Sequence, residues 1–304
     1  MSEIDKCFIP GCDLHYNDVI DLLSLSFLIY NYNFTKTNSL EDDTILNFID
    51  RIKLLTIDKK QDDLSETKLK ALDHININMS DGLIKEFISD PDTDLQVGIT
   101  TSERNKRINI IFRGSESTYD WLHDLNFIKT CIDKENNVYV HKGFYNQLTI
   151  NDNHKKLILQ VQELIKNNPD YNIFITGHSL GAGLSSLFGY LLSKEISNNI
   201  TIISFASPRV GNYGWYKSFN KQVNLTYYRF VNCNDVVTAF PSLLFYHVGQ
   251  AIRLKCDGRV KLLEKKYSWS EFTLFKCYSP TDHFCGEYYK NLLKVQSNNP
   301  IKID

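Results

Sequence analysis

Residues 172–190 read Asn-Ile-Phe-Ile-Thr-Gly-His-Ser-Leu-Gly-Ala-Gly-Leu-Ser-Ser-Leu-Phe-Gly-Tyr. Residues 173–175 form an apolar run typical of a buried strand, and the residues after Ser179 have the small and apolar character of a packed helix. Gly177 and Gly181 lie two residues either side of Ser179, so strand and helix can pass closely while the serine occupies a strained turn at the positive end of the helix. The bare Gly-x-Ser-x-Gly pattern also arises by chance, but between a strand and a helix it predicts an activated serine.

Strands and helices alternate on both sides of this segment. The apolar run 173–175 and the nearly apolar run 200–205 are typical of central strands that are buried on both faces. The alternation predicts an α/β fold with a mostly parallel central sheet covered by helices on both faces. The expected strands span residues 95–100, 108–112, 172–176, 200–205 and 225–230, and the expected helices span residues 147–167, 179–194 and 213–222.

The first 94 residues have a different pattern. Asp18 to Tyr30 is amphipathic at helical spacing, and Ser80 is a plausible N-cap for a second helix over residues 80–88. We find no internal repeat and no linker rich in Pro or Gly. We therefore expect a single domain over residues 1–304, with an N-terminal helical flank over 1–94 and a catalytic core over 95–293.

The composition restricts the partners and the compartment. The 36 acidic and 34 basic residues nearly cancel, so no general field attracts nucleic acid, and any contact with lipid must be local and apolar. The N-terminus lacks the basic start of a signal peptide, and the first apolar run is interrupted by Asp21 and Asn31. Seven cysteines without regular spacing suit reduced thiols better than disulfides or a zinc site. We expect an intracellular protein with no transmembrane segment, no metal and no cofactor.

A serine hydroxyl needs a histidine base and an orienting carboxylate to become a nucleophile, and in this kind of fold they follow the serine in the order carboxylate, then histidine. Asp235 lies just past the expected strand 225–230, at the sheet edge where open α/β sheets gather their sites. It is our candidate carboxylate. The alternative is an Asx turn, a common use of an Asn-Asp pair.

Two histidines follow Asp235, and their spacing does not choose between them. His247 leads into a stretch that reads as a strand, whereas His283 lies between a Pro-containing loop and a helix, which favours His283 as the base. The other histidines, His141 and His178 among them, precede or adjoin the serine and are expected to be structural.

Seven ordered blocks between Leu95 and Leu293 resemble the class 3 lipases, the fungal-type family of the α/β-hydrolase superfamily. The resemblance implies the α/β-hydrolase fold, which agrees with the alternation of strands and helices. The blocks are Ile110 to Ser117 with Trp121 and Asp124-Leu125, Val140 to Phe144, Thr176 to Ala182, Phe205 to Asn212, Asn234-Asp235, Tyr246 to Gly249, and Asp282-His283.

The resemblance also implies roles for particular residues. Ser179, Asp235 and His283 would form the catalytic triad, and the hydroxyl of Ser115 with the backbone N–H of Leu180 would form the oxyanion hole. Without the resemblance, Ser115 would read as a turn serine. The segment after Ser115 resembles the short lid of the family, with an apolar stripe formed by Trp121, Leu122 and Leu125, although such stripes usually face a core.

These observations predict a serine hydrolase that cleaves carboxylic esters of lipids, an acylglycerol lipase or a phospholipase, in transient contact with a lipid surface. Two alternatives share the sequence features. One is a catalytically inactive lipase-like module that binds lipid or protein, which would not need all of the catalytic groups. The other is an acyltransferase or thioesterase with the same triad, because the pocket, not the nucleophile, selects the acceptor.

Overall fold

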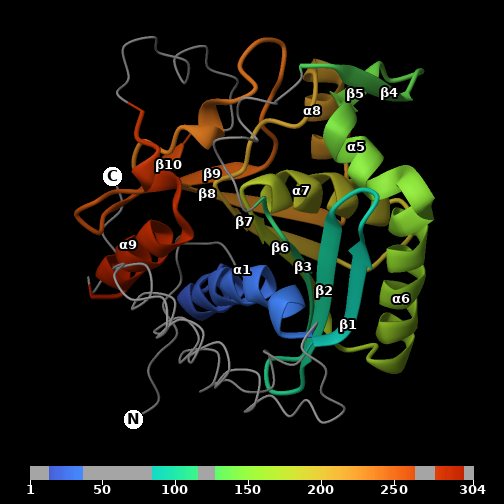
Figure 1. Cartoon of the computed structure of the whole chain (residues 1–304), viewed down its shortest axis with the longest axis horizontal. Helices are drawn as coiled ribbons and strands as arrows, with labels where there is room; N and C mark the ends of the chain where they lie inside the picture. Colours follow the sequence, from blue (N-terminus) through green and yellow to red (C-terminus); the bar gives the residue numbers. More distant parts are fainter. Residues whose placement is uncertain (1–13, 37–83, 116–126, 264–277, 298–304) are drawn as a thin grey trace.

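A computed structural model describes residues 14–36, 84–115, 127–263 and 278–297 (Figure 1), with side chains described only to Tyr30 within the first range. Its centre is an eight-stranded sheet in the order β1-β2-β3-β6-β7-β8-β9-β10. The strands β3, β6, β7, β8 and β9 run parallel, and the strands at the two edges pair antiparallel. The strands are β1 (Ile84–Asp90), β2 (Leu95–Ser102), β3 (Arg107–Phe112), β6 (Asn172–His178), β7 (Ile200–Phe205), β8 (Leu225–Asn232), β9 (Gln250–Leu254) and β10 (Val260–Leu263).

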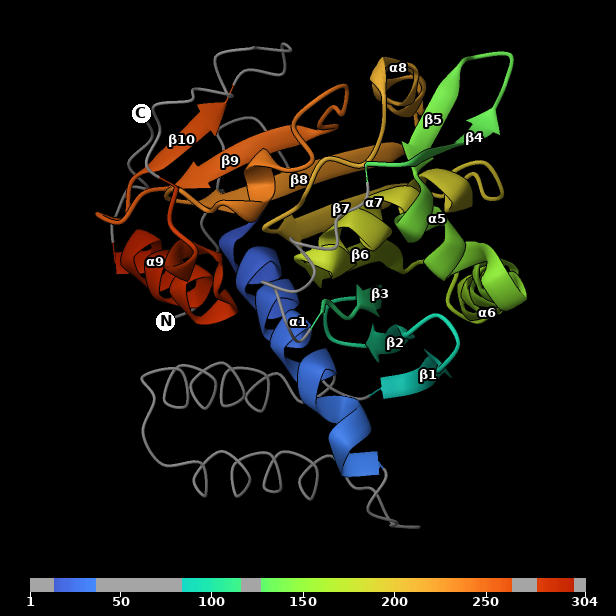
Figure 2. The same ribbon diagram turned by 45° about the horizontal axis from the view of Figure 1, so that its top comes forward.

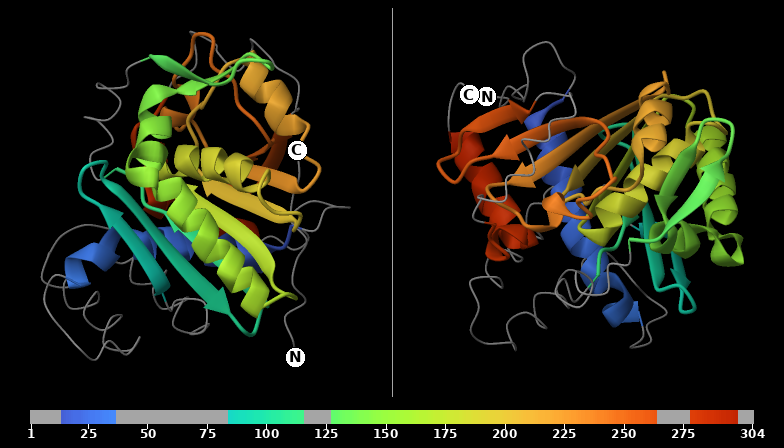
Figure 3. Two further views of the ribbon diagram at one scale, coloured as in Figure 1. Left: turned by 90° about the vertical axis from the view of Figure 1, so that its right-hand side faces the viewer. Right: turned by 90° about the horizontal axis from the view of Figure 1, so that it is seen from above.

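Helices cover both faces of this sheet (Figures 2 and 3). One face packs against α1 and α9, and the other against α5, α6, α7 and α8. Side chains along β7 alternate between these two faces of the sheet. Ile202 faces the α7 side, whereas Ile203 and Phe205 face the α1 side. The helices are α1 (Tyr16–Lys36), α5 (Lys142–Thr149), α6 (Asn153–Asn167), α7 (Leu180–Leu192), α8 (Tyr213–Asn220) and α9 (Cys285–Ser297). This is the predicted α/β-hydrolase architecture, and it presents the carboxyl ends of the parallel strands at one edge.

The expected helix over residues 80–88 is wrong for its described part. Residues Ile84–Asp90 form β1, which pairs antiparallel with β2 from Asp90 opposite Leu95. Ile84, Phe87 and Ile88 have a spacing that fits a helix, but hydrogen bonding to the neighbouring strand overrides this local pattern. A β4–β5 hairpin (Lys129–Asp133 and Val138–His141), which the sequence pattern did not predict, lies beside α5.

Helix α1 belongs to the core instead of flanking it. Its residues 19–29 are buried, including the polar Asp21, Ser24 and Ser26. On β3, Arg107 is 1% exposed and pairs with Asp18 at 2.8 Å and with Asp21 at 2.6 Å. This buried ion pair fixes α1 across the sheet, so residues 16–30 position the central strands.

The expectation that all cysteines are reduced is wrong for one pair in the structure. Cys233, directly after β8, is joined to Cys256, in the turn between β9 and β10, with Cα atoms 6.2 Å apart. Cys131 and Cys285 are free. Because the expected intracellular location rested in part on reduced thiols, that location stays a prediction. Within the described ranges, no helix is long and apolar enough to cross a membrane.

Candidate active site

The segment that carries Ser179 folds as a sharp turn between β6 and α7. Ser179 has φ 58° and ψ −124°, a left-handed conformation that a non-glycine residue adopts only when the surroundings hold it. A Cβ on Gly177 would come within 2.5 Å of the backbone of Gly181. Strand and helix therefore touch through these two glycines, and the backbone N–H of Ser179 is held by the carbonyl oxygen of Phe205 at 3.0 Å.

Asp235 lies in the turn after β8, with its backbone N–H donating to the Asn232 carbonyl at 2.9 Å. Its Oδ1 accepts the backbone N–H of Val237 at 2.9 Å, so the Asx turn that we considered as an alternative is present. The same Oδ1 lies 3.0 Å from Nδ1 of His283. The turn and the contact with the histidine thus occur together at one oxygen.

His283 ends a short 3-10 helix (Thr281–His283) directly before α9. Its Nε2 lies 3.0 Å from Oγ of Ser179, and its Nδ1 faces Asp235. The side chains of all three residues are buried, each with a relative exposure of 1%. The structure therefore brings Ser179, His283 and Asp235 into one hydrogen-bonded chain from residues far apart in the sequence.

Electrostatics favour the ionised form of Asp235. Burial raises the pKa of its carboxyl group, but His283 and the hydrogen bonds from His283 and Tyr288 outweigh burial, so the pKa of Asp235 is lowered overall. The hydroxyl of Tyr288 on α9 donates to Oδ2 of Asp235 at 2.6 Å. A carboxylate that stays charged can hold an imidazole by its Nδ1–H and stabilise the imidazolium when the ring accepts a proton.

His247 is held elsewhere. Its Nε2 donates to the carbonyl oxygen of Thr238 at 2.8 Å, within the 3-10 helix Val237–Ala239. Burial, followed by the charges of Arg229 and Arg209, holds the pKa of His247 well below its ordinary value. A neutral histidine whose Nε2 is bonded to a carbonyl is not available as a base for Ser179.

The two candidate oxyanion donors come from adjacent elements. Leu180 is the first residue of α7, so its backbone N–H is at the positive end of that helix. Ser115 follows β3, the neighbour of β6, and is half-buried. A Cβ on Gly114 would lie 2.5 Å from the carbonyl oxygen of His178, so the loop with Ser115 runs against the residue before Ser179. The lid residues Trp121, Leu122 and Leu125 lie outside the described residues, and the lid stays a prediction.

Several residues that support the site were not singled out from the sequence. Asn232 donates from Nδ2 to the carbonyl oxygen of Asp282 at 2.9 Å, and the backbone N–H of Asn234 donates to the Asp282 carboxylate at 2.9 Å. Both bonds dock the loop of His283 on the end of β8. Tyr288, and His178 beside Ser179, also contact the site. Asn232 could have been found from the sequence, because it is a polar residue at the end of a strand. Tyr288 could not, because its position fits an ordinary aromatic residue of the core.

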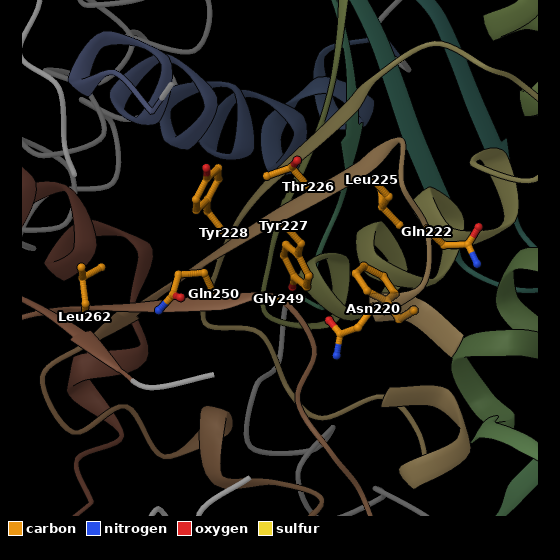
Figure 4. Close-up of a pocket in the computed structure, with 10 residues that line it drawn as sticks. Asn220, Gln222, Leu225, Thr226, Tyr227, Tyr228, Gly249, Gln250 and Leu262 are labelled. Atoms are coloured by element: carbon orange, nitrogen blue, oxygen red, sulfur yellow. The ribbon is translucent and has the colours of Figure 1, made fainter. Parts of the chain in front are cut away.

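A groove of about 310 Å³ lies at the other end of the sheet (Figure 4). Leu225 and Tyr227 line it from the amino end of β8, and Gly249 and Gln250 line it from the start of β9. Ser179 and Asp235, by contrast, follow the carboxyl ends of their strands. The groove is therefore separate from the candidate site. Among the described residues, no group of His, Cys, Asp or Glu side chains is arranged to hold a metal ion.

Residues 109–245 match the family described as lipase (class 3). This part of the chain is thus similar to the class 3 lipases. The matched region contains Ser115, Ser179 and Asp235, and His283 lies beyond it.

The chain is similar to several known proteins over about half of its length. It is 32% identical over 163 residues to a lipase of Rhizomucor miehei, covering 52% of this chain and 44% of that protein. It is 30% identical over 168 residues to the secreted mono- and diacylglycerol lipase A of Penicillium cyclopium, covering 54% and 53%. Phospholipase A1-II 6 of Oryza sativa subsp. japonica is 28% identical over 180 residues, covering 49% and 44%. The chain thus spans about half the length of these relatives.

Solved structures of lipases share the fold over most of the chain. A triacylglycerol lipase whose catalytic centre is described as a serine protease triad superposes with a TM-score of 0.68 at 21% identity, covering 90% of this chain and 94% of that one. The triacylglyceride lipase of Rhizomucor miehei superposes with a TM-score of 0.63 at 22% identity, covering 81% and 96%. At these identities the likeness establishes the fold.

Proposed function

We propose that this protein hydrolyses carboxylic esters of lipids, with Ser179 as the nucleophile, His283 as the general base and Asp235 as the orienting carboxylate. The observation that carries the proposal is the continuous chain of hydrogen-bond distances, 3.0 Å from Ser179 Oγ to His283 Nε2 and 3.0 Å from His283 Nδ1 to Asp235 Oδ1. A serine hydroxyl becomes a nucleophile at neutral pH when such a base accepts its proton.

The reaction follows from this geometry in two halves. In the first half, Ser179 Oγ attacks the ester carbonyl carbon while its proton passes to His283 Nε2. The tetrahedral intermediate then expels the alcohol, which takes the proton from His283 and leaves an acyl group on Ser179. In the second half, water gives a proton to His283 and attacks the acyl carbon, and Ser179 recovers its proton as the carboxylic acid leaves.

The negative charge on the former carbonyl oxygen requires fixed donors in each half. We assign this role to the backbone N–H of Leu180 and to the hydroxyl of Ser115. The position of Leu180 at the start of α7 and the contact between the Ser115 loop and β6 support the assignment. Loss of one such donor typically lowers kcat by roughly 10² to 10³.

Similarity to the class 3 lipases and the names of the relatives support lipid esters as the substrate class. The relatives include mono- and diacylglycerol lipases and a phospholipase A1. These names describe lipases and a phospholipase. We propose the same class of ester here, with contact at a lipid surface during turnover.

The test combines a covalent probe with substrates of graded length. A fluorophosphonate should label the wild-type protein on Ser179, and p-nitrophenyl esters, a triacylglycerol emulsion and phospholipid vesicles should rank the substrates. Ser179→Ala should abolish labelling and lower turnover by roughly 10⁶, and Asp235→Asn should lower it by roughly 10⁴. His283→Gln should remove activity, whereas the matched variant His247→Gln should retain it.

Three outcomes would change the assignment. Undiminished labelling of Ser179→Ala would exclude this nucleophile. A folded wild-type protein that binds lipid vesicles but neither reacts with the probe nor hydrolyses any ester would identify a binding module. Transfer of the acyl group to an alcohol or release from a thioester, in preference to hydrolysis of oxygen esters, would identify a different acceptor chemistry.

A further inference from the structure

The ring of His178, next to the candidate nucleophile, has a partner at each nitrogen. Nε2 lies 2.8 Å from the backbone carbonyl oxygen of His283, and Nδ1 lies 3.1 Å from the hydroxyl oxygen of Tyr30 on α1. A carbonyl oxygen only accepts, so Nε2 carries the proton. Nδ1 of the neutral ring is then an acceptor, and the Tyr30 hydroxyl donates to it. The two partners therefore fix the tautomer of His178.

The ring of His178 also lies beside the ring of the candidate base, tilted against it. Its centroid lies 4.7 Å from that of His283, with 37° between the planes. Burial, followed by the neighbouring His283, lowers the pKa of His178 to about 3. A ring that stays neutral does not oppose the positive charge that His283 acquires when it accepts the serine proton, whereas a charged ring at this distance would.

His283 is thus held at three atoms by three residues, which lie at the carboxyl ends of two strands. Asp235 after β8 binds Nδ1, Ser179 after β6 faces Nε2, and His178 at the end of β6 binds the backbone carbonyl. Bonds from Asn232 and the backbone of Asn234 hold the preceding residue of the loop. Loss of the bond from His178 should therefore leave the loop docked and alter the orientation of His283 within it.

Tyr30 also contacts the loop that leads to Ser115. A Cβ built on Gly114 would fall directly on the Tyr30 hydroxyl, well inside van der Waals contact. The absence of a side chain at Gly114 therefore lets Tyr30 reach His178 between the two loops. One hydroxyl on α1 touches both the residue before Ser115 and the histidine that binds His283.

We propose that Tyr30 and His178 act as positioning residues, in which Tyr30 fixes the tautomer of His178 and His178 holds the catalytic base His283 by its backbone carbonyl. The proposal rests on the proposed function, because it assigns His283 as the base. It also gives α1 a role in the chemistry, since the hydroxyl that starts this chain of bonds comes from the first described helix.

The experiment separates the hydrogen bond from the space that the ring fills. His178→Leu removes the Nε2–H donor, whereas His178→Gln keeps an N–H donor at nearly the same distance from the backbone. We expect kcat for a soluble p-nitrophenyl ester to fall about 100-fold in His178→Leu, with KM within about threefold of wild type, because a misoriented base slows the chemical step. His178→Gln should recover kcat to within about fivefold of wild type. The rate of inactivation by a fluorophosphonate should follow kcat in each variant.

Tyr30→Phe tests the hydrogen bond from the Tyr30 hydroxyl to Nδ1 of His178. We expect kcat to fall about fivefold, and we expect no further loss when Tyr30→Phe is added to His178→Leu, because Tyr30 would act through His178. Tyr16→Phe is the matched control, since it removes one hydroxyl from the same helix, and that hydroxyl donates to the Leu292 carbonyl at 3.1 Å instead of to His178. It should leave kcat unchanged. If His178→Leu does not fold by circular dichroism, the comparison of Tyr30→Phe with Tyr16→Phe decides.

Three results would overturn the inference while wild-type activity stands. The first is a folded His178→Leu variant with near-normal kcat. The second is an equal loss of kcat in His178→Leu and His178→Gln. The third is a loss of kcat from Tyr30→Phe that is the same in wild type and in His178→Leu. A wild-type protein that neither reacts with the fluorophosphonate nor hydrolyses an ester would instead overturn the proposed function and this inference with it.

Discussion

The Tyr288 hydroxyl donates to Oδ2 of Asp235 across 2.6 Å, while Oδ1 of the same carboxylate faces His283. Tyr288 is buried in the first turn of α9, directly after the loop that carries His283. Burial, followed by the charge of Asp235, holds the pKa of Tyr288 well above its ordinary value, so the phenol keeps its proton. The helix that follows the base thus also holds the carboxylate that orients it.

Removal of this hydroxyl should weaken catalysis without loss of the fold. In Tyr288→Phe the buried Asp235 carboxylate loses one charge-assisted hydrogen bond, and such bonds contribute about 1.5–3 kcal/mol. We expect kcat/KM for a soluble ester to fall roughly tenfold or more. Tyr190→Phe is the control and should leave kcat/KM near wild type, because the α7 hydroxyl that it removes bonds Ser218 on α8 at 2.7 Å. Equal effects in the two variants would show that Tyr288 contributes only packing.

The parts of the fold that the sequence predicted are those where local pattern and tertiary structure agree. The runs that became β3, β6 and β7 are apolar, buried and bounded by turns, so both their type and their order were predictable. β1 was not, because the spacing of Ile84, Phe87 and Ile88 suits a helix, and only pairing with β2 overrides it.

The residues of the candidate site also differ in how far the local sequence predicts them. Ser179 has a local motif, and Asp235 has a position after a strand. The choice between His247 and His283 depends on where the loop around Asp282 docks, and its docking bonds to Asn232 and Asn234 come from a strand about fifty residues away. Spacing along the chain does not contain that information. The catalytic roles themselves stay predictions until the variants are measured.

The lowered pKa of His178 predicts a pH dependence of stability. An unfolded histidine gains a proton below a pH of about 6.5, whereas folded His178 does so only at about 3, because burial, followed by His283, disfavours the charged ring. Between these values the unfolded state binds more protons, so the free energy of unfolding should fall as pH falls, by about 1.4 kcal/mol per pH unit from this group.

Urea unfolding of wild type and His178→Gln between pH 7.5 and pH 4.5 measures this contribution. Glutamine does not titrate, so the stability of the variant should decline less steeply below a pH of about 6.5. The two curves should run parallel above that pH. Parallel curves over the whole range would mean that His178 titrates alike in the folded and unfolded chains.

The bond between Cys233 and Cys256 predicts that reduction lowers stability. It closes a loop of 23 residues in the unfolded chain, and the loss of loop entropy for that length corresponds to about 3 kcal/mol. We expect dithiothreitol to lower the melting temperature of the wild-type protein by several degrees. The double variant Cys233→Ala with Cys256→Ala should melt at the same temperature with and without dithiothreitol. A wild-type melting temperature that does not respond to the reductant would restore the expectation of reduced thiols.

Ion pairs from Arg107 on β3 hold α1 on the sheet. The neighbouring residue Lys106, in the turn before β3, forms an exposed ion pair and so offers a matched comparison. Arg107 is 1% exposed and its partner Asp21 is 6% exposed, whereas Lys106 and its partner Asp170 are 63% and 57% exposed. Removal of one partner from a buried pair leaves an uncompensated charge and typically costs about 3–5 kcal/mol, whereas an exposed pair contributes about 0–1 kcal/mol.

Arg107→Met should therefore lower the free energy of unfolding by about 3–5 kcal/mol in urea titrations. Lys106→Met, the matching change one residue earlier, should leave the free energy of unfolding nearly unchanged, because solvent screens its exposed ion pair. Adding Asp18→Asn and Asp21→Asn to Arg107→Met should recover part of the loss, because the buried negative charges that Arg107 compensates are then absent. Since α1 carries Tyr30, which contacts His178, Arg107→Met should also lower kcat at temperatures where the variant is still folded. If Arg107→Met and Lys106→Met lose the same stability, or if the added Asn substitutions deepen the loss, α1 is held by its apolar face alone and the buried charges do not fix its place.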